Sequence, residues 1–122
     1  MTAFEITPDQ LHTYKARVRS IYDADTFRLD IDLGCYVWLY NESVRLGRVD
    51  AWELRGAERE KGLLARDWLA SNMPEGSDIL VRTNKDKKGK YGRYIVDVCH
   101  PVLGDLAEAM VNEGHAEWWK YN

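Results

Sequence analysis

Two stretches decide how this chain folds and what chemistry it can carry: Tyr22-Asp23-Ala24-Asp25-Thr26-Phe27 and Val44-Arg45-Leu46-Gly47-Arg48-Val49-Asp50-Ala51-Trp52-Glu53. Each places acidic residues beside apolar, strand-like residues, and Arg45 stands between the two acidic clusters. A folded chain can therefore bring three or four carboxylates and a guanidinium to the mouth of one small core. Hard cations and phosphates bind at such places.

The residues around these stretches alternate in polarity as strands do. Residues 15–33 read as one long strand, in which Asp25 shares the parity of the apolar residues Phe27, Leu29, Ile31 and Leu33. We therefore expect Asp25 at the rim of the core, partly desolvated, where a cation or an arginine would relieve the cost of an unpaired charge. Residues 36–46 read as a second strand, with Arg45 reaching out of the face opposite Trp38, Tyr40, Val44 and Leu46.

The rest of the chain predicts two helices and two further strands. The first helix is expected from about residue 56 to 72, with one buried stripe formed by Ala57, Leu64, Ala65, Trp68 and Leu69. Residues 79–83 and 94–99 read as strands joined by a basic turn. Asp105, three residues before Glu108, predicts the start of the second helix, and Gly114 predicts its end. This order predicts an α+β, mainly β domain, with helices appended to a small curled sheet.

Length and composition limit the functional classes. The 122 residues suffice for one domain with a core of its own. The net charge of -3 argues against a surface that attracts nucleic acid everywhere, so such a site must be local. The candidate is residues 85–93, with five cationic side chains against one acid; its alternative is a solvated hairpin tip. Cys35 and Cys99 are expected to be free, buried thiols.

The first residues lack a basic start followed by an apolar stretch, and no apolar run is long enough to span a bilayer. We therefore expect no membrane association and a cytoplasmic protein, or a secreted one if a signal peptide was removed.

Four motifs in order resemble the staphylococcal nuclease family from about residue 15 to 121. They are Asp23-Ala24-Asp25-Thr26-Phe27, Arg45-Leu46 with Asp50-Ala51-Trp52-Glu53, Lys90-Tyr91-Gly92-Arg93, and Met110-Val111-Asn112-Glu113-Gly114-His115-Ala116. The resemblance implies a five-stranded oligonucleotide/oligosaccharide-binding (OB) barrel with two or three flanking helices. It divides the chain into an N-terminal extension, residues 1–14, and one barrel domain, residues 15–122.

The resemblance also implies a Ca2+-dependent nuclease that hydrolyses DNA or RNA by in-line attack of water, releasing the 5′-oxygen. Asp25, Asp50 and the carbonyl of Ala51 would bind Ca2+, which favours oxygen ligands, while Asp23 and Thr26 would orient ligands and waters. The catalytic residues would be Arg45 and Arg93, which clamp the phosphate, and Glu53, which accepts a proton from water or holds it in line. The nucleotide would be contacted by Lys90 and Tyr91.

Simpler interpretations stay open for the same residues. The acids can be turn residues or surface charges, Arg45 can form a cross-strand ion pair, and Glu53 can be a favourable charge ahead of a helix. Arg48 either steers substrate or has no specific role. The alternative function is a non-catalytic barrel that binds single-stranded nucleic acid or a protein partner, and the chain is expected to be a monomer or possibly a homodimer.

Two departures from the family pattern predict local differences. Ala24 replaces a glycine, so the turn carrying Asp25 is expected to differ. Trp52 replaces a proline, which is expected to free the segment presenting Ala51 and Glu53.

Overall fold

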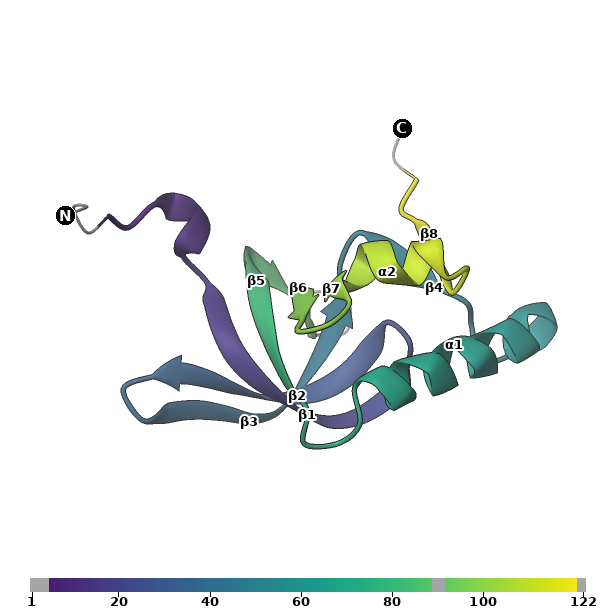
Figure 1. The fold of residues 1–122 in the computed structure, drawn as a ribbon, viewed down its shortest axis with the longest axis horizontal. Coiled ribbons are helices and arrows are strands. Elements are labelled where there is room, and N and C mark those ends of the chain that lie inside the picture. The colour runs from purple at the N-terminus through teal and green to yellow at the C-terminus, as the bar shows by residue number, and fades with distance from the viewer. Residues whose placement is uncertain (1–4, 89–91, 121–122) are drawn as a thin grey trace.

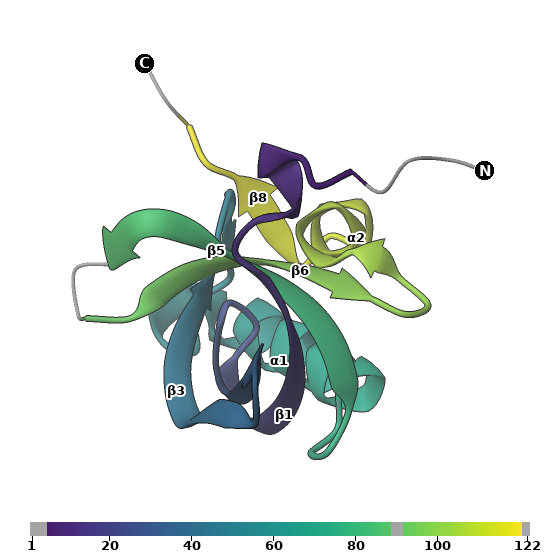
Figure 2. The same cartoon turned by 90° about the vertical axis from the view of Figure 1, so that its left-hand side faces the viewer.

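The computed structural model describes residues 5–88 and 92–120, which form a barrel with helices packed against it (Figures 1 and 2). The elements in chain order are η1 (Pro8–Gln10), β1 (Thr13–Asp23), β2 (Thr26–Gly34), β3 (Val37–Leu46), β4 (Val49–Ala51), η2 (Gly56–Glu58), α1 (Arg59–Asn72), β5 (Asp78–Lys88), β6 (Tyr94–His100), β7 (Gly104–Asp105), α2 (Leu106–Asn112) and β8 (Ala116–Trp118). The predicted α+β, mainly β class is confirmed.

Five strands close the barrel. The sheet runs β3-β2-β1-β5-β6, and β3 pairs with β6 in parallel, which joins the two edges. Closure removes the exposed edges that an open sheet of this size would leave. The short strands β4 and β8 form a separate antiparallel pair outside the barrel. The predicted OB barrel is therefore confirmed, with two α-helices beside it.

The core consists of the inward-facing side chains of the barrel together with one stripe from each helix. Its largest members include Phe27, Leu29, Ile31, Leu46, Leu69, Leu106 and Met110. In Figure 1 α1 lies along one side of the barrel and α2 lies above β6, near β4 and β8.

The single long strand predicted for residues 15–33 is wrong. The Asp23 side chain accepts a hydrogen bond from the backbone N–H of Asp25 at 3.1 Å, which stabilises a turn between β1 and β2. Leu33, expected in the core, is exposed near the tip of the β2–β3 hairpin. The buried positions also change parity between the two strands, from Ala16 and Val18 in β1 to Phe27, Leu29 and Ile31 in β2, which one continuous strand would not show.

The first helix begins and ends close to prediction, but its predicted stripe is partly wrong. The buried residues of α1 are Gly62, Ala65 and Leu69, whereas Leu64 is 65% exposed. Because Gly62 lets the helix approach the chain closely, the buried face is centred on this glycine rather than on the leucine.

The second helix follows the prediction at both ends. Asp105 caps α2 by accepting a hydrogen bond from the N–H of Ala107 at 3.1 Å, and Gly114 adopts a φ of 79° just after the helix. Both cysteines are free but exposed, so their predicted burial is wrong. Cys35 lies at a hairpin tip, and Cys99 has the outward parity of β6.

Candidate active site

One open pocket of about 1050 Å³ gathers most of the residues that the sequence singled out. Its walls come from the β1–β2 turn, the end of β3, β4 and the segment after it, and the residue that precedes β6. The pocket lining includes Asp23, Asp25, Thr26, Arg45, Asp50, Ala51, Glu53 and Arg93. Segments up to 97 residues apart in the chain, from Ser20 to Glu117, thus contribute polar side chains to one cavity.

Asp25 is the buried anchor of this pocket, only 8% exposed, as its parity predicted. Its carboxylate accepts hydrogen bonds from Thr26 Oγ1 at 3.1 Å, the backbone N–H of Ala51 at 3.0 Å and Arg45 Nη2 at 3.4 Å. Its backbone carbonyl accepts from the N–H of Leu46 at 2.8 Å. These bonds offset the cost of desolvating the carboxylate and tie the β1–β2 turn to β3 and β4.

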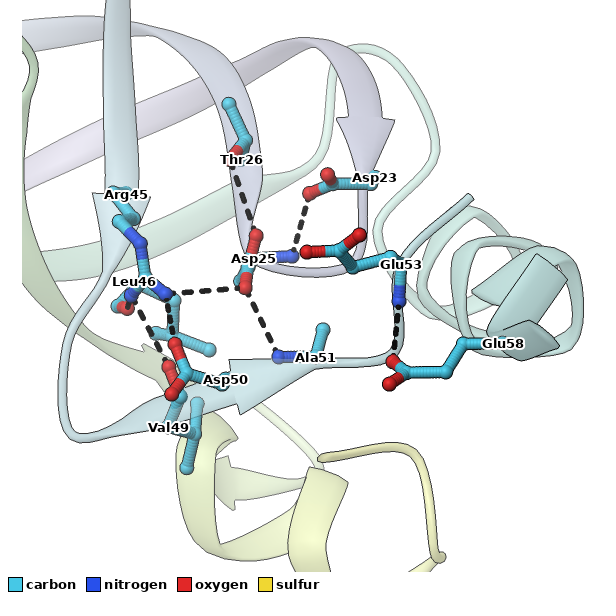
Figure 3. A network of polar contacts seen from close by, with 10 residues as sticks. All are labelled: Asp23, Asp25, Thr26, Arg45, Leu46, Val49, Asp50, Ala51, Glu53 and Glu58. Carbon is cyan, nitrogen blue, oxygen red and sulfur yellow. Dashed lines mark hydrogen bonds and ion pairs between the residues drawn. The ribbon is translucent and has the colours of Figure 1, made fainter. Parts of the chain in front are cut away.

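Arg45 lies between Asp25 and Asp50, two of the three candidate metal ligands (Figure 3). Its Nη2 is 3.4 Å from Asp25 Oδ2 and 2.5 Å from Asp50 Oδ1, and its Nη1 donates to the carbonyls of Leu46 at 2.8 Å and Val49 at 3.1 Å. The guanidinium carbon is also 5.5 Å from the centre of the Trp119 ring, within the range of a cation–π contact. Arg45 is therefore preorganised at the junction of both acids.

Asp23 lies beside Asp25, and the pKa of its carboxyl group is raised above the ordinary value for aspartate. Burial, together with a hydrogen bond to Asp25 and repulsion by its charge, raises the pKa of Asp23 to about 7. Two neighbouring carboxyls in a partly desolvated place favour one proton between them.

The segment that carries Glu53 is held firmly, so the expectation that Trp52 frees it is wrong. Trp52 Nε1 donates to the carbonyl of Gly114 at 2.8 Å, its backbone N–H donates to the carbonyl of His115 at 3.4 Å, and Lys61 Nζ lies 4.7 Å above the indole ring. The contacts of Trp52 therefore restrain the backbone of this segment, as the fixed φ of a proline would.

Gly62 of α1 packs directly against the backbone of the same segment. A Cβ at this position would lie 2.1 Å from the carbonyl oxygen of Glu53 and 3.0 Å from that of Trp52, so only glycine permits this close approach. The backbone N–H of Glu53 also donates to Glu58 at 3.1 Å, and Figure 3 shows the Glu53 carboxylate directed toward the space beside Asp23 and Asp25. Sequence reasoning missed Gly62, although a glycine inside a predicted helix is a known sign of close packing.

Ala24 also fits its turn. The turn does not use a positive φ at this residue, and the methyl group is fully buried in the core. Glycine is therefore not required here, and the predicted difference is a gain of core contact rather than a distorted turn.

Arg48 lies outside the pocket lining, and its ion pairs connect parts of the fold. It pairs with Asp97 at 2.9 Å and with Asp105 at 2.7 Å, and its guanidinium lies 5.8 Å from the centre of the Trp118 ring. The hydrogen bond to Asp105 raises the pKa of Arg48. Burial opposes ionisation of Asp105, but Arg48 outweighs it and the pKa of Asp105 is lowered. These contacts fasten the start of α2 to β6.

The donors at the pocket fit a hard divalent cation. Within the described ranges, no three or more His, Cys, Asp or Glu side chains form a metal-binding group. The carboxylates of Asp25 and Asp50, joined through Arg45, are instead an oxygen-only set that needs water and phosphate to complete it. Ca2+ accepts such partly hydrated, flexible coordination. Lys90 and Tyr91 lie outside the described residues.

The fold and pocket define a class of protein: a small closed barrel with a pocket lined by acids and arginines. Comparison with family models gives a match to the staphylococcal nuclease homologue family over residues 43–122, more than half of the chain. The chain therefore belongs to this family, whose members are nucleases or nucleic-acid-binding modules. The matched range includes Arg45, Asp50, Glu53 and Arg93, while Asp25 precedes it. A search of curated proteins found no match.

Across residues 5–88 and 92–120, the helices are all too short or too polar to cross a lipid bilayer.

Proposed function

We propose that this chain is a Ca2+-dependent nuclease that hydrolyses phosphodiester bonds of DNA or RNA by in-line attack of water. One observation carries the proposal: Asp25, Asp50, Arg45, Glu53 and Arg93 line a single pocket. A binding module needs positive charge and flat apolar surface, but it does not need buried carboxylates beside the phosphate site. Carboxylates repel nucleic acid, so their presence there favours catalysis.

The cation would be held by Asp25, Asp50 and the carbonyl of Ala51. Bound there, Ca2+ supplies positive charge that polarises the phosphate and offsets its repulsion by the acids. Thr26 and Asp23 keep Asp25 in its orientation, through hydrogen bonds of 3.1 Å each. The proposed role of Thr26 is thus to fix the direction of the carboxylate oxygens, and that of Asp23 is to fix the backbone that carries them.

Arg45 and Arg93 would bind the phosphate oxygens. A guanidinium donates two parallel hydrogen bonds and keeps its charge at any working pH, so it favours the state in which negative charge has grown. Arg45 already contacts both acids, so a phosphate bound next to them lies within reach of its guanidinium. Losing one preorganised donor of this kind typically lowers the rate by about 10²- to 10³-fold.

Glu53 would hold the attacking water and accept its proton. The water oxygen then bonds to phosphorus, the bond to the 5′-oxygen breaks, and the leaving oxygen takes a proton from solvent. The anchoring of Trp52 and Gly62 supports this role, since the carboxylate needs a fixed position relative to the phosphate. We further propose that residues 15–122 carry the activity, that residues 1–14 are an extension, and that Lys90 and Tyr91 contact the nucleotide.

The test is digestion of single-stranded DNA and RNA by the wild type, with Ca2+ or with chelator, and by Glu53→Gln. We expect cleavage that requires Ca2+ and falls about 10²- to 10⁴-fold in Glu53→Gln, the usual contribution of a general base. The matched control is Glu60→Gln, an exposed glutamate of α1 outside the pocket lining, which should retain activity. Tight binding without any cleavage would instead identify a non-catalytic module.

A further inference from the structure

An aromatic stack lies on the β2–β3 hairpin outside the pocket. The rings of Trp38 and Tyr40 are nearly parallel, with centroids 6.0 Å apart and an interplanar angle of 10°. The guanidinium carbon of Arg17 lies 5.9 Å from the centre of the Trp38 ring. Tyr40 is 68% exposed, so the stack ends in a ring that is open to solvent.

The stack lies on the same face of the sheet as the pocket. Leu39 pairs with buried Ile31 and packs toward the core, which directs Trp38 to the opposite face. Farther along β3, Val44 faces the core, so Ser43 and Arg45 also point outward. A bulge around Asn41, with φ of 55°, inserts one extra residue and shifts the register of β3. The expectation that Trp38 and Tyr40 share the face of Val44 and Leu46 is therefore wrong, because Tyr40 is exposed whereas Val44 and Leu46 are buried.

The charges near the stack complement a phosphate chain. Arg17, Arg28 and Lys15 on neighbouring strands are exposed. Two of the nearby acids have local partners: Asp30 accepts from the N–H of Asn41 at 2.8 Å, and Asp32 accepts from the N–H of Gly34 at 2.8 Å. The ion pair of Arg17 with Asp78, at 3.5 Å, lies in solvent and is weak, so it leaves Arg17 available to a polyanion.

We propose that Trp38 and Tyr40 form a base-stacking subsite that holds single-stranded nucleic acid beyond the scissile phosphate. This inference rests on the proposed function and narrows its substrate class. Tyr40 lies five positions before Arg45, which is roughly 13–17 Å along a strand. At about 3.4 Å per stacked phosphate this distance spans no more than about five nucleotides. Only an unpaired base can present its face to Tyr40, so the subsite favours single strands over duplexes, without base preference.

The experiment compares the affinity for a thymidine dinucleotide, which reaches only the pocket, with that for an oligothymidylate of about ten residues. Fluorescence anisotropy is measured with Ca2+ on Glu53→Gln protein, in which cleavage is suppressed. We expect Tyr40→Ala and Tyr40→Leu to lower the ratio of long-strand to dinucleotide affinity by about 5- to 100-fold, the range of one lost base stack. Tyr40→Phe should preserve the ratio because it keeps the ring. The control Tyr36→Ala, on the same hairpin but outside the stack, should also preserve it.

An unchanged ratio in both Tyr40→Ala and Tyr40→Leu overturns the subsite. Sedimentation gives a second result that overturns the subsite: Tyr40→Ala abolishes self-association while the affinity ratio stays constant. A second copy of the chain would then be the occupant of this surface. In either case dinucleotide binding that is lost in Arg45→Ala leaves the proposed function standing. Conversely, Tyr40-dependent binding of the long strand by a wild type that cleaves nothing keeps the subsite and rejects the nuclease.

Discussion

Replacing Gly62 by alanine tests whether close packing of α1 positions Glu53. The added Cβ would lie 2.1 Å from the Glu53 carbonyl oxygen and 2.6 Å from its carbon, both backbone atoms that have no alternative rotamer. Relief requires a shift of roughly 1 Å between α1 and the Glu53 segment, since carbon and oxygen seldom approach within about 3.4 Å. A misplacement of about 1 Å near the reacting groups can cost about 100-fold in rate.

The effect on stability should be small by comparison. Overpacking costs about 1–3 kcal/mol, and exchanging glycine for alanine within a helix returns about 1 kcal/mol. We therefore expect the free energy of unfolding in urea to fall by about 0–2 kcal/mol, while kcat for oligonucleotide cleavage falls about 100-fold. Ser71→Ala, an exposed alanine substitution in the same helix, should change neither quantity appreciably. Full activity with a stability gain in Gly62→Ala would refute the reasoning.

Three further outcomes follow from the contacts of single residues. Because the folded protein raises the pKa of Asp23 from 3.8 to about 7, its proton stabilises the fold below about pH 4 and that contribution is lost as the pH rises through 7. We therefore compare the free energy of unfolding in urea of Asp23→Asn with that of the wild type. The difference should shift in favour of Asp23→Asn by about 1–2 kcal/mol from about pH 4 to pH 8, after discounting for solvent screening. An equal difference at both pH values would contradict the raised pKa. Ala24→Gly should lower the midpoint of unfolding by removing a buried methyl group, at a cost of about 1–2 kcal/mol, and a stabilised variant would count against the packed turn. Arg48 has a φ of 70°, so Arg48→Ala should be less stable than Arg48→Gly by about 1 kcal/mol in thermal denaturation, although both lose the ion pairs; the reverse order would rule out the strained backbone.

Strand alternation and capping chemistry were sufficient to predict a small curled sheet and the second helix, whereas the closed barrel was predicted from the resemblance to the staphylococcal nuclease family. The parity of Asp25 correctly predicted burial at the core rim, and Asp105 and Gly114 correctly marked the ends of α2. Such features depend on local periodicity and on turn or cap residues, which the sequence displays directly.

Features set by tertiary approach were not predictable in the same way. The close contact of Gly62 with Glu53, the anchoring of Trp52 by Gly114, and the pairing of β4 with β8 each involve segments that meet only in the folded chain. Arg45 illustrates the same point within the site. A cross-strand ion pair and a phosphate clamp were separate interpretations of this residue, and its contacts with Asp25 and Asp50 make the first a fact without excluding the second.

The central claim is that a divalent cation and a phosphodiester share the pocket formed by Asp25, Asp50 and Arg45. Calorimetric titration of a nucleoside 3′,5′-bisphosphate with and without Ca2+ tests it most directly, because two ligands at one site must change each other's affinity reciprocally. We predict that Ca2+ tightens nucleotide binding by about 5- to 150-fold in the wild type and has no such effect in Asp50→Asn. Equal nucleotide affinity with and without Ca2+ in the wild type would contradict the claim.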